Sequence, residues 1–137
     1  DTNSEEARAA GLRVLVAEDE PLVRQILSTM LRFLGCEATF VRDGEAAVRD
    51  FAASLAGPAP YDLVLMDLTM PRMDGVAATR ALRGMAPDVR VIAMTGFVAE
   101  YERARSKENG FGAWLDKAFT PEELRAAMTA VLGRDRA

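Results

Sequence analysis

The chain has 137 residues, half of them hydrophobic and 28% charged, which fits a single globular domain with a buried core. It carries 17 basic and 21 acidic residues for a net charge of -4 and shows no basic cluster, so direct nucleic-acid binding is not expected. A single cysteine, Cys36, and the lack of histidine exclude an internal disulfide, a cysteine metal site and catalysis by an imidazole of the chain itself. No apolar run reaches the roughly 18 residues of a membrane span, and no signal-peptide pattern opens the sequence. We therefore expect a cytoplasmic domain without membrane contact.

The apolar pattern predicts a strand and a helix alternating five times between a polar lead-in at residues 1–11 and a tail at residues 134–137. The expected strands are residues 12–17, 36–41, 63–66, 89–94 and 111–115, and the expected helices are residues 21–34, 45–55, 76–85, 100–109 and 121–132. This alternation indicates an α/β domain over residues 12–133, with a doubly wound five-stranded parallel sheet of order 2-1-3-4-5.

Several helix signals support these boundaries. Pro21 fits the first position of a helix, and Thr120 to Glu123 form a capping box. Apolar residues recur at helical spacing in the first helix, and the second and last helices each present an inward face. These sets are Leu22, Val23, Ile26, Leu27, Met30, Leu31 and Leu34; Val48, Phe51, Ala52 and Leu55; and Leu124, Ala127, Met128, Val131 and Leu132. Residues 100–109 carry few apolar side chains, which predicts a weakly anchored helix.

The segment from Tyr61 to Gly75 is the most informative part of the chain. Four apolar residues, Leu63 to Met66, read as a fully buried parallel strand, and Asp67 stands where this strand opens into a loop that contains Pro71. Ligands of open parallel sheets bind at this edge. Taken alone, Asp67 is better explained as a helix cap or a loop aspartate than as a functional residue.

The full string Asp67, Met70, Pro71, Met73, Asp74, Gly75 after an apolar strand resembles the phosphoacceptor segment of bacterial response-regulator receiver domains. The resemblance covers residues 12–132 and implies a flavodoxin-like fold. It also implies that Asp67 accepts a phosphoryl group from the phosphohistidine of a histidine kinase or phosphotransfer domain. Because the chain has no histidine, the donor must lie elsewhere.

Glu18, Asp19 and Glu20 follow the first strand and can be explained as helix N-terminal acids that complement the helix dipole. Beside Asp67, the first two match the acidic pair of the receiver family. Two carboxylates about 5 Å apart repel by roughly 3 kcal/mol at an effective dielectric near 20, so such a cluster requires a cation. The resemblance implies Mg²⁺, bound directly by Asp19 and Asp67, mainly through water by Glu18, and by the backbone carbonyl of Thr69.

Three further residues match family positions near strand ends. Thr95, which alone would read as a strand end followed by a turn, matches the switch hydroxyl. Lys117, otherwise a solvated lysine, matches the phosphate-binding lysine. Trp114, which alone would be explained as a core or edge packing residue, matches the rotating aromatic residue of the family, where tyrosine or phenylalanine is more usual.

Ala118 departs from the family pattern, which has proline after this lysine and a cis peptide. A cis bond to a non-proline residue costs about 2.5 to 4 kcal/mol, against under 1 for proline. The sequence therefore favours a trans or mixed Lys117–Ala118 peptide, a displaced Lys117 and weaker phosphate binding than in relatives.

These features predict the receiver module of a two-component phosphorelay, which would catalyse its own aspartyl phosphorylation and dephosphorylation and switch the surface around its last two helices for a downstream protein partner. A homodimer is compatible with this reading.

One alternative is a degenerate receiver that acts as a phosphorylation-independent docking or dimerisation module, with Ala118 as its main support. Another is an aspartate-nucleophile phosphatase, which would need an aspartate where Thr69 stands. For the parent protein, we expect the C-terminal receiver of a hybrid histidine kinase, with a stand-alone regulator as the alternative.

Overall fold

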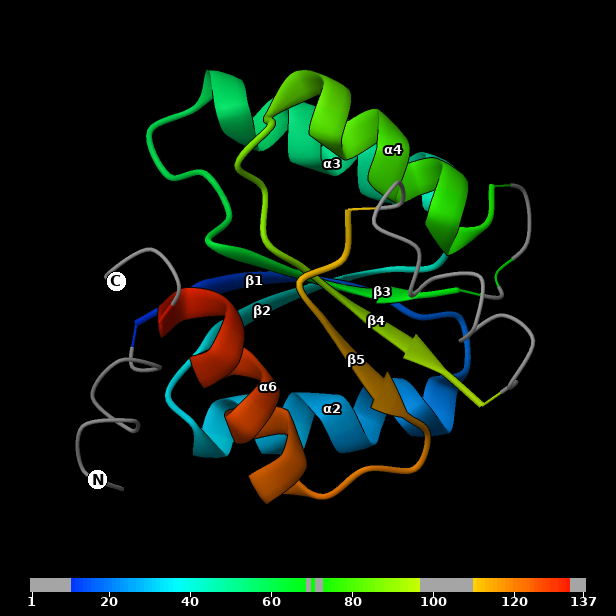
Figure 1. The fold of residues 1–137 in the computed structure, drawn as a ribbon, viewed down its shortest axis with the longest axis vertical. Helices are drawn as coiled ribbons and strands as arrows, with labels where there is room; N and C mark the ends of the chain where they lie inside the picture. The colour runs from blue at the N-terminus through cyan, green and yellow to red at the C-terminus, as the bar shows by residue number, and fades with distance from the viewer. Residues whose placement is uncertain (1–10, 69, 71–72, 97–109, 134–137) are drawn as a thin grey trace.

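The computed structural model describes residues 11–68, 70, 73–96 and 110–133. Within them, five parallel strands form one sheet in the order β2-β1-β3-β4-β5, which confirms the predicted topology (Figure 1). The strands are β1 Arg13–Ala17, β2 Glu37–Val41, β3 Leu63–Asp67, β4 Val91–Thr95 and β5 Ala113–Asp116. Neighbouring strands pair in parallel register, with Val14 opposite Leu63 and Asp67 opposite Met94.

Helices cover both faces of the sheet and give a three-layer α/β/α arrangement (Figure 1). The helices α2 and α6 lie on one face, and α3 and α4 lie on the other. Their bounds are α2 Pro21–Phe33, α3 Gly44–Ala56, α4 Gly75–Met85 and α6 Pro121–Gly133. The predicted helix at residues 100–109, the residues 1–10 of the predicted lead-in and the predicted tail at residues 134–137 lie outside the described residues.

The sheet separates two apolar clusters because successive side chains of a strand point to opposite faces. Val16 and Leu65 belong to the cluster beneath α2 and α6, whereas Leu15 and Met66 belong to the cluster beneath α3 and α4. All four side chains are fully buried. A strand that is apolar on both faces is typical of a parallel sheet covered by helices, and this is the pattern by which the sequence identified β3.

The helix starts follow local sequence signals. Asp43 caps α3 by accepting a hydrogen bond from the backbone N–H of Ala46 at 2.7 Å, and Asp74 caps α4 through Ala77 at 2.8 Å. The predicted capping box of α6 is confirmed by reciprocal bonds between Thr120 and Glu123, at 2.8 and 3.1 Å.

The inward face predicted for α3 was partly wrong, and the apolar residues that recur along α2 are not all buried. Leu27 and Leu31 are buried, but Leu22 is 68% exposed and Ile26 is 47% exposed. Residues advance by about 100° each around a helix, so the apolar set of α2 spans more than the face that the sheet can cover. In α3, Ala52 and Leu55 are likewise exposed. The described part of the chain contains no helix that is both long and apolar enough to cross a membrane.

Thr79 of α4 gives a test of packing between the helices and the sheet. Its side chain is fully buried, and its hydroxyl has no hydrogen-bond partner among the described residues. Because a buried hydroxyl without a partner costs free energy, we expect Thr79→Val, which keeps the branched shape, to raise the free energy of unfolding by about 1 kcal/mol in urea denaturation. Thr29→Val is the matched control, since Thr29 is exposed and its hydroxyl donates to the carbonyl of Gln25 at 3.2 Å. An equal gain in both variants would contradict this explanation.

Candidate functional site

The carboxyl ends of four neighbouring strands, β1, β3, β4 and β5, meet at one edge of the sheet, and polar side chains stand there. Glu18 and Asp19 follow β1, Asp67 ends β3, and Thr95 ends β4. Lys117 comes directly after β5. Segments that are up to 99 residues apart in the chain are thereby brought together.

The acidic cluster consists of Glu18, Asp19 and Asp67. One carboxylate oxygen from each residue lies within 4.8 Å of the others. Glu18 is fully buried and Asp67 is 1% exposed, whereas Asp19 is half-buried and opens the cluster toward solvent. At this separation each pair of charges repels by about 3 kcal/mol at an effective dielectric of 20. Such an arrangement requires compensating positive charge.

The Lys117 ammonium supplies part of this compensation. Its Nζ lies 3.0 Å from Oε1 of Glu18 and 3.1 Å from Oδ2 of Asp67. The backbone N–H of Lys117 also donates to the carbonyl of Thr95 at 3.0 Å. Lys117 is thus fixed at both its backbone and its side chain, and its charge stands between two carboxylates.

The N-terminus of α2 adds a second source of positive potential. The backbone N–H of Glu20, the residue that precedes the helix, donates to Oε2 of Glu18 at 3.2 Å. Pro21 occupies the first helical position. The first turn of a helix carries unpaired N–H groups and a partial positive charge, which favours carboxylates at this place.

The shifted pKa values follow from these surroundings. Burial raises the pKa of Glu18, the negative charge of Asp67 raises it further, and the contact with Lys117 opposes both effects. For Lys117, burial works against the charged form, but the hydrogen bond to Glu18 and the charge of Asp67 outweigh it, so the pKa of Lys117 lies above its ordinary value. The ammonium is therefore retained at neutral pH.

Thr95 and Trp114 lie on the same face of neighbouring strands. Thr95 is 1% exposed and stands two residues after Ala93, so both side chains point to the α3 and α4 side of the sheet. Trp114 pairs in register with Ala93 and packs, half-buried, against the same cluster. Thr69, whose carbonyl was predicted as a metal ligand, lies outside the described residues.

A family model described as "Response regulator receiver domain" matches residues 14–129. The chain belongs to this family.

Two curated relatives and one solved structure illustrate the similarity. The receiver domain is 35% identical over 126 residues to transcription factor SKN7 of Saccharomyces cerevisiae, covering 92% of this chain and 19% of that protein. It is 34% identical over 125 residues to response regulator MprA of Mycobacterium tuberculosis, covering 91% of this chain and 52% of that protein. The chain thus spans about a fifth of the first relative and about half of the second.

The solved structure is the receiver domain of sensor histidine kinase PA1611 from Pseudomonas aeruginosa PAO1, described with a magnesium ion coordinated in the active-site cleft. It superposes with a TM-score of 0.79 at 33% identity and covers 90% of this chain and 99% of its own.

The acidic cluster of this receiver domain fits a hard divalent cation. Carboxylate oxygens are the ligands that Mg²⁺ prefers, and Mg²⁺ binds through few carboxylates while it keeps several waters. In the part of the chain that the structure describes, three carboxylates face one ammonium, so negative charge remains to be neutralised. Asp19, which is the most exposed of the three, leaves one side of the cluster accessible to an ion and its waters.

The prediction of a trans Lys117–Ala118 peptide was wrong, because this peptide bond is cis. The displacement of Lys117 that the trans form implied is not observed, since the ammonium contacts both Glu18 and Asp67. Weaker phosphate binding than in relatives stays a prediction.

Sequence reasoning missed a close backbone contact next to Asp67. Gly75, which opens α4, lies against the carbonyl group of Asp67, and a Cβ atom at this position would overlap it. The sequence placed Asp74 and Gly75 only at the end of the motif that begins at Asp67. Nothing in the sequence alone shows that the chain returns to touch the peptide of Asp67.

Lys117→Met tests the charge balance of the cluster. In the presence of a chelator we expect the free energy of unfolding to fall by about 2 kcal/mol, because two buried carboxylates lose their charged partner. Adding millimolar Mg²⁺ should recover more stability in the variant than in the wild type, since no ammonium competes for the carboxylates. Urea denaturation with and without Mg²⁺ measures both effects. Arg49→Met, at an exposed position of α3, is the charge-matched control; equal stability of the two variants in chelator would count against this account.

Proposed function

We propose that this receiver domain is the phosphoacceptor module of a two-component phosphorelay, in which Asp67 accepts a phosphoryl group from a phosphohistidine in the presence of Mg²⁺. The observation that carries the proposal is the environment of Asp67. One oxygen of its buried carboxylate lies within 4.8 Å of an oxygen of each of the other two carboxylates, and Oδ2 of Asp67 lies 3.1 Å from the Lys117 ammonium. A nucleophile, a cation-binding cluster and a positive charge for phosphate oxygens thus occupy one place.

The proposed reaction is an in-line displacement at phosphorus. A carboxylate oxygen of Asp67 forms the new O–P bond while the P–N bond to the donor imidazole breaks. Lys117 holds one equatorial phosphoryl oxygen with a compact positive charge, which requires it to exchange part of its contact with Asp67 for the phosphoryl group. Glu18, Asp19, Asp67 and the carbonyl of Thr69 would hold Mg²⁺, which supplies positive charge to the transferring group.

The acyl phosphate then acts as a switch. It adds close to two negative charges at the end of β3. In this proposal the Thr95 hydroxyl donates a hydrogen bond to a phosphoryl oxygen. Trp114, which lies on the same face of the neighbouring strand, changes its packing in response. The altered surface around the last two helices is read by a downstream protein partner, and hydrolysis resets it. We place this exchange in the cytoplasm, within a hybrid histidine kinase.

Asp67→Asn tests the phosphoacceptor role. With acetyl phosphate and Mg²⁺, the wild type should gain one phosphoryl group by intact mass or Phos-tag electrophoresis, and Asp67→Asn should gain none, since an amide is not a nucleophile. Asp74→Asn, in the same motif, should be phosphorylated like the wild type because asparagine caps helices as well as aspartate does. Phosphorylation of the Asp67→Asn protein would refute the assignment.

A phosphorylation-independent docking module is the competing function. It predicts that beryllofluoride, an analogue of the phosphoryl group, leaves the fluorescence of Trp114, the one tryptophan of the chain, unchanged in Mg²⁺. The receiver proposal predicts a change that is abolished in Asp67→Asn.

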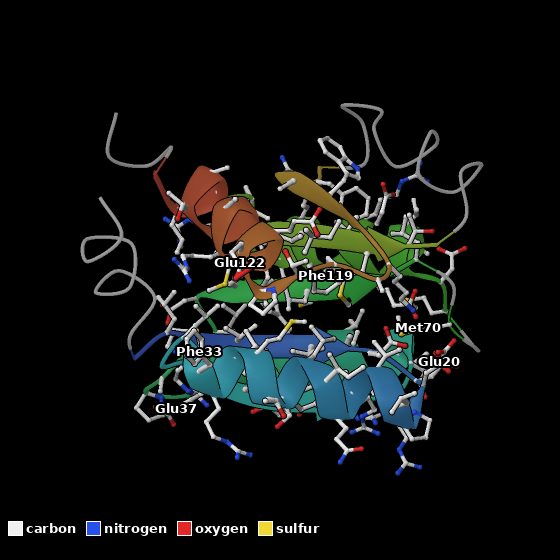
Figure 2. All side chains as sticks on the ribbon, turned by 90° about the horizontal axis from the view of Figure 1, so that it is seen from below. Glu20, Phe33, Glu37, Met70, Phe119 and Glu122 are labelled. Carbon is white, nitrogen blue, oxygen red and sulfur yellow. The ribbon has the colours of Figure 1, made fainter. Side chains whose placement is uncertain are left out.

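The surface next to Lys117 fits a helical phosphohistidine carrier. A small groove of about 80 Å³ is lined by Lys117 and by apolar side chains of α2 and of the segment before α6, namely Val23, Ile26, Leu27, Met30, Ala118 and Phe119. Leu22, Thr29 and Phe33 are exposed along α2, and together with the exposed Ile26 of the groove they have the 4-3-4 spacing of a helix-packing seam. Figure 2 shows Glu20, at the start of α2, on the same side of the molecule as Met70, with Phe33 at the opposite end. The seam therefore runs from the site along α2.

Ile26→Asp tests this donor surface. We expect it to slow phosphotransfer from an autophosphorylated histidine kinase that phosphorylates the wild type by at least about tenfold, because a charge is placed in an apolar contact. The rate with acetyl phosphate should not change, since this small donor needs no docking surface. Leu55→Asp, at an equally exposed apolar position of α3, is the control. A uniform loss with both donors, or no loss with either, would contradict the assignment.

A further inference from the structure

Two glycines, Gly44 and Gly75, form backbone contacts that leave no room for a side chain. A Cβ atom at Gly44, the first residue of α3, would overlap the carbonyl group of Met73. A Cβ atom at Gly75, the first residue of α4, would overlap the carbonyl group of Asp67 and the Cα of Leu68. Neither glycine is among those with positive φ in the described chain. The requirement for glycine here is space and not backbone conformation.

These contacts form a continuous path from α3 to the peptide of Asp67. Gly44 lies against Met73, two residues further Gly75 begins α4, and Gly75 lies against Asp67. The N–H of Gly75 also donates to the carbonyl of Leu68 at 3.3 Å. This bond joins the two ends of the connection between β3 and α4. The N–H of Leu68 in turn donates to the carbonyl of Met94 on β4 at 3.0 Å.

The side chains of the connection strengthen this arrangement. Met70 and Met73 both pack, partly buried, against the apolar cluster on the α3 and α4 side of the sheet. The carbonyl of Met73 is held against the first turn of α3, whose start is fixed by the Asp43 cap. The described part of the connection is therefore supported by backbone contacts at Met73 and Gly75 and by the packing of the Met70 and Met73 side chains.

We propose that Gly44 and Gly75 are positioning residues for the acidic cluster, and that Gly44 acts on the cluster through Met73 and Gly75. Gly75 lies against the backbone carbonyl of Asp67, and the Asp67 side chain carries the carboxylate of the cluster. A shift of this peptide would lengthen the 3.1 Å contact to Lys117 and change the spacing to Glu18 and Asp19. Misplacement of a reacting group by about 1 Å can cost a hundredfold in rate.

The competing explanation is that both glycines serve only close packing of α3 and α4. That role would lower the melting temperature but leave the cluster of the folded protein unchanged. The two explanations therefore differ in cation binding and reaction rate measured below the melting transition, and not in stability.

The test compares Gly44→Ala and Gly75→Ala with Gly84→Ala. Gly84 is an exposed glycine within α4, and apart from its own helix backbone and chain neighbours no atom of the described residues lies within 4 Å of the place that a Cβ would take, so alanine is accommodated. For variants shown to be folded by circular dichroism, Mg²⁺ affinity is measured by isothermal titration and the phosphorylation rate with acetyl phosphate by intact mass. We expect at least about tenfold weaker Mg²⁺ binding and tenfold slower phosphorylation for the first two, and wild-type values for Gly84→Ala. Wild-type values in folded Gly44→Ala would overturn the proposal.

The double variant tests the path. If Gly44 acts through Gly75, the loss of Mg²⁺ affinity in Gly44→Ala/Gly75→Ala should be smaller than the product of the two single losses. Multiplicative losses would overturn the claim that the two residues act in series.

A measurement on the wild type keeps the test decisive where alanine variants fail to fold. The backbone amide signal of Gly44 in an NMR titration should shift with Mg²⁺, whereas that of Gly84 should not; an unmoved Gly44 signal would overturn the proposal. The phosphorylation arm rests on the proposed function, but the Mg²⁺ arms do not. Failure of the wild type to accept phosphate would therefore count against the phosphoacceptor role alone.

Discussion

The structure depends on one electrostatic constraint, which is that three carboxylates share a small, largely buried space. Burial and the negative charge of Asp67 both raise the pKa of Glu18, which shows the cost of placing these groups together. The Lys117 ammonium offsets part of this cost at 3.0 and 3.1 Å, and the first turn of α2 contributes further positive potential. Among the described residues one ammonium faces three carboxylates, and the negative charge that remains suits a divalent cation.

The parallel sheet makes this concentration of charge possible. All five strands run in the same direction, so the carboxyl ends of β1, β3, β4 and β5 meet at one edge. Apolar side chains fill both faces of the sheet, and the buried polar side chains Glu18, Asp67 and Thr95 stand at strand ends or directly after them. The same rigid strands that form the core therefore fix the relative positions of Glu18, Asp67 and Lys117.

The helices divide the molecule into surfaces with different roles. On one side, the apolar seam of α2 and the groove beside Lys117 form the proposed docking surface, which adjoins the site directly. On the other side, α3 and α4 support the connection after β3 through backbone contacts at Gly44 and Gly75. The proposed donor recognition and the proposed positioning of Asp67 thus lie on opposite faces of the sheet.

The sequence by itself determined the strand order, the boundaries of the described strands and helices to within a few residues, and the identity of Glu18, Asp19, Asp67 and Lys117 as the groups at the site. It could do so because buried parallel strands and helix caps are local patterns, and because the motif after β3 is specific. Three features were decided only by the tertiary structure: the exposure of Leu22 and Ile26, the cis Lys117–Ala118 peptide, and the contacts of Gly44 and Gly75 with distant backbone. Each depends on which surface lies opposite a residue in space, and no local pattern of apolar, polar or turn-forming residues carries that information.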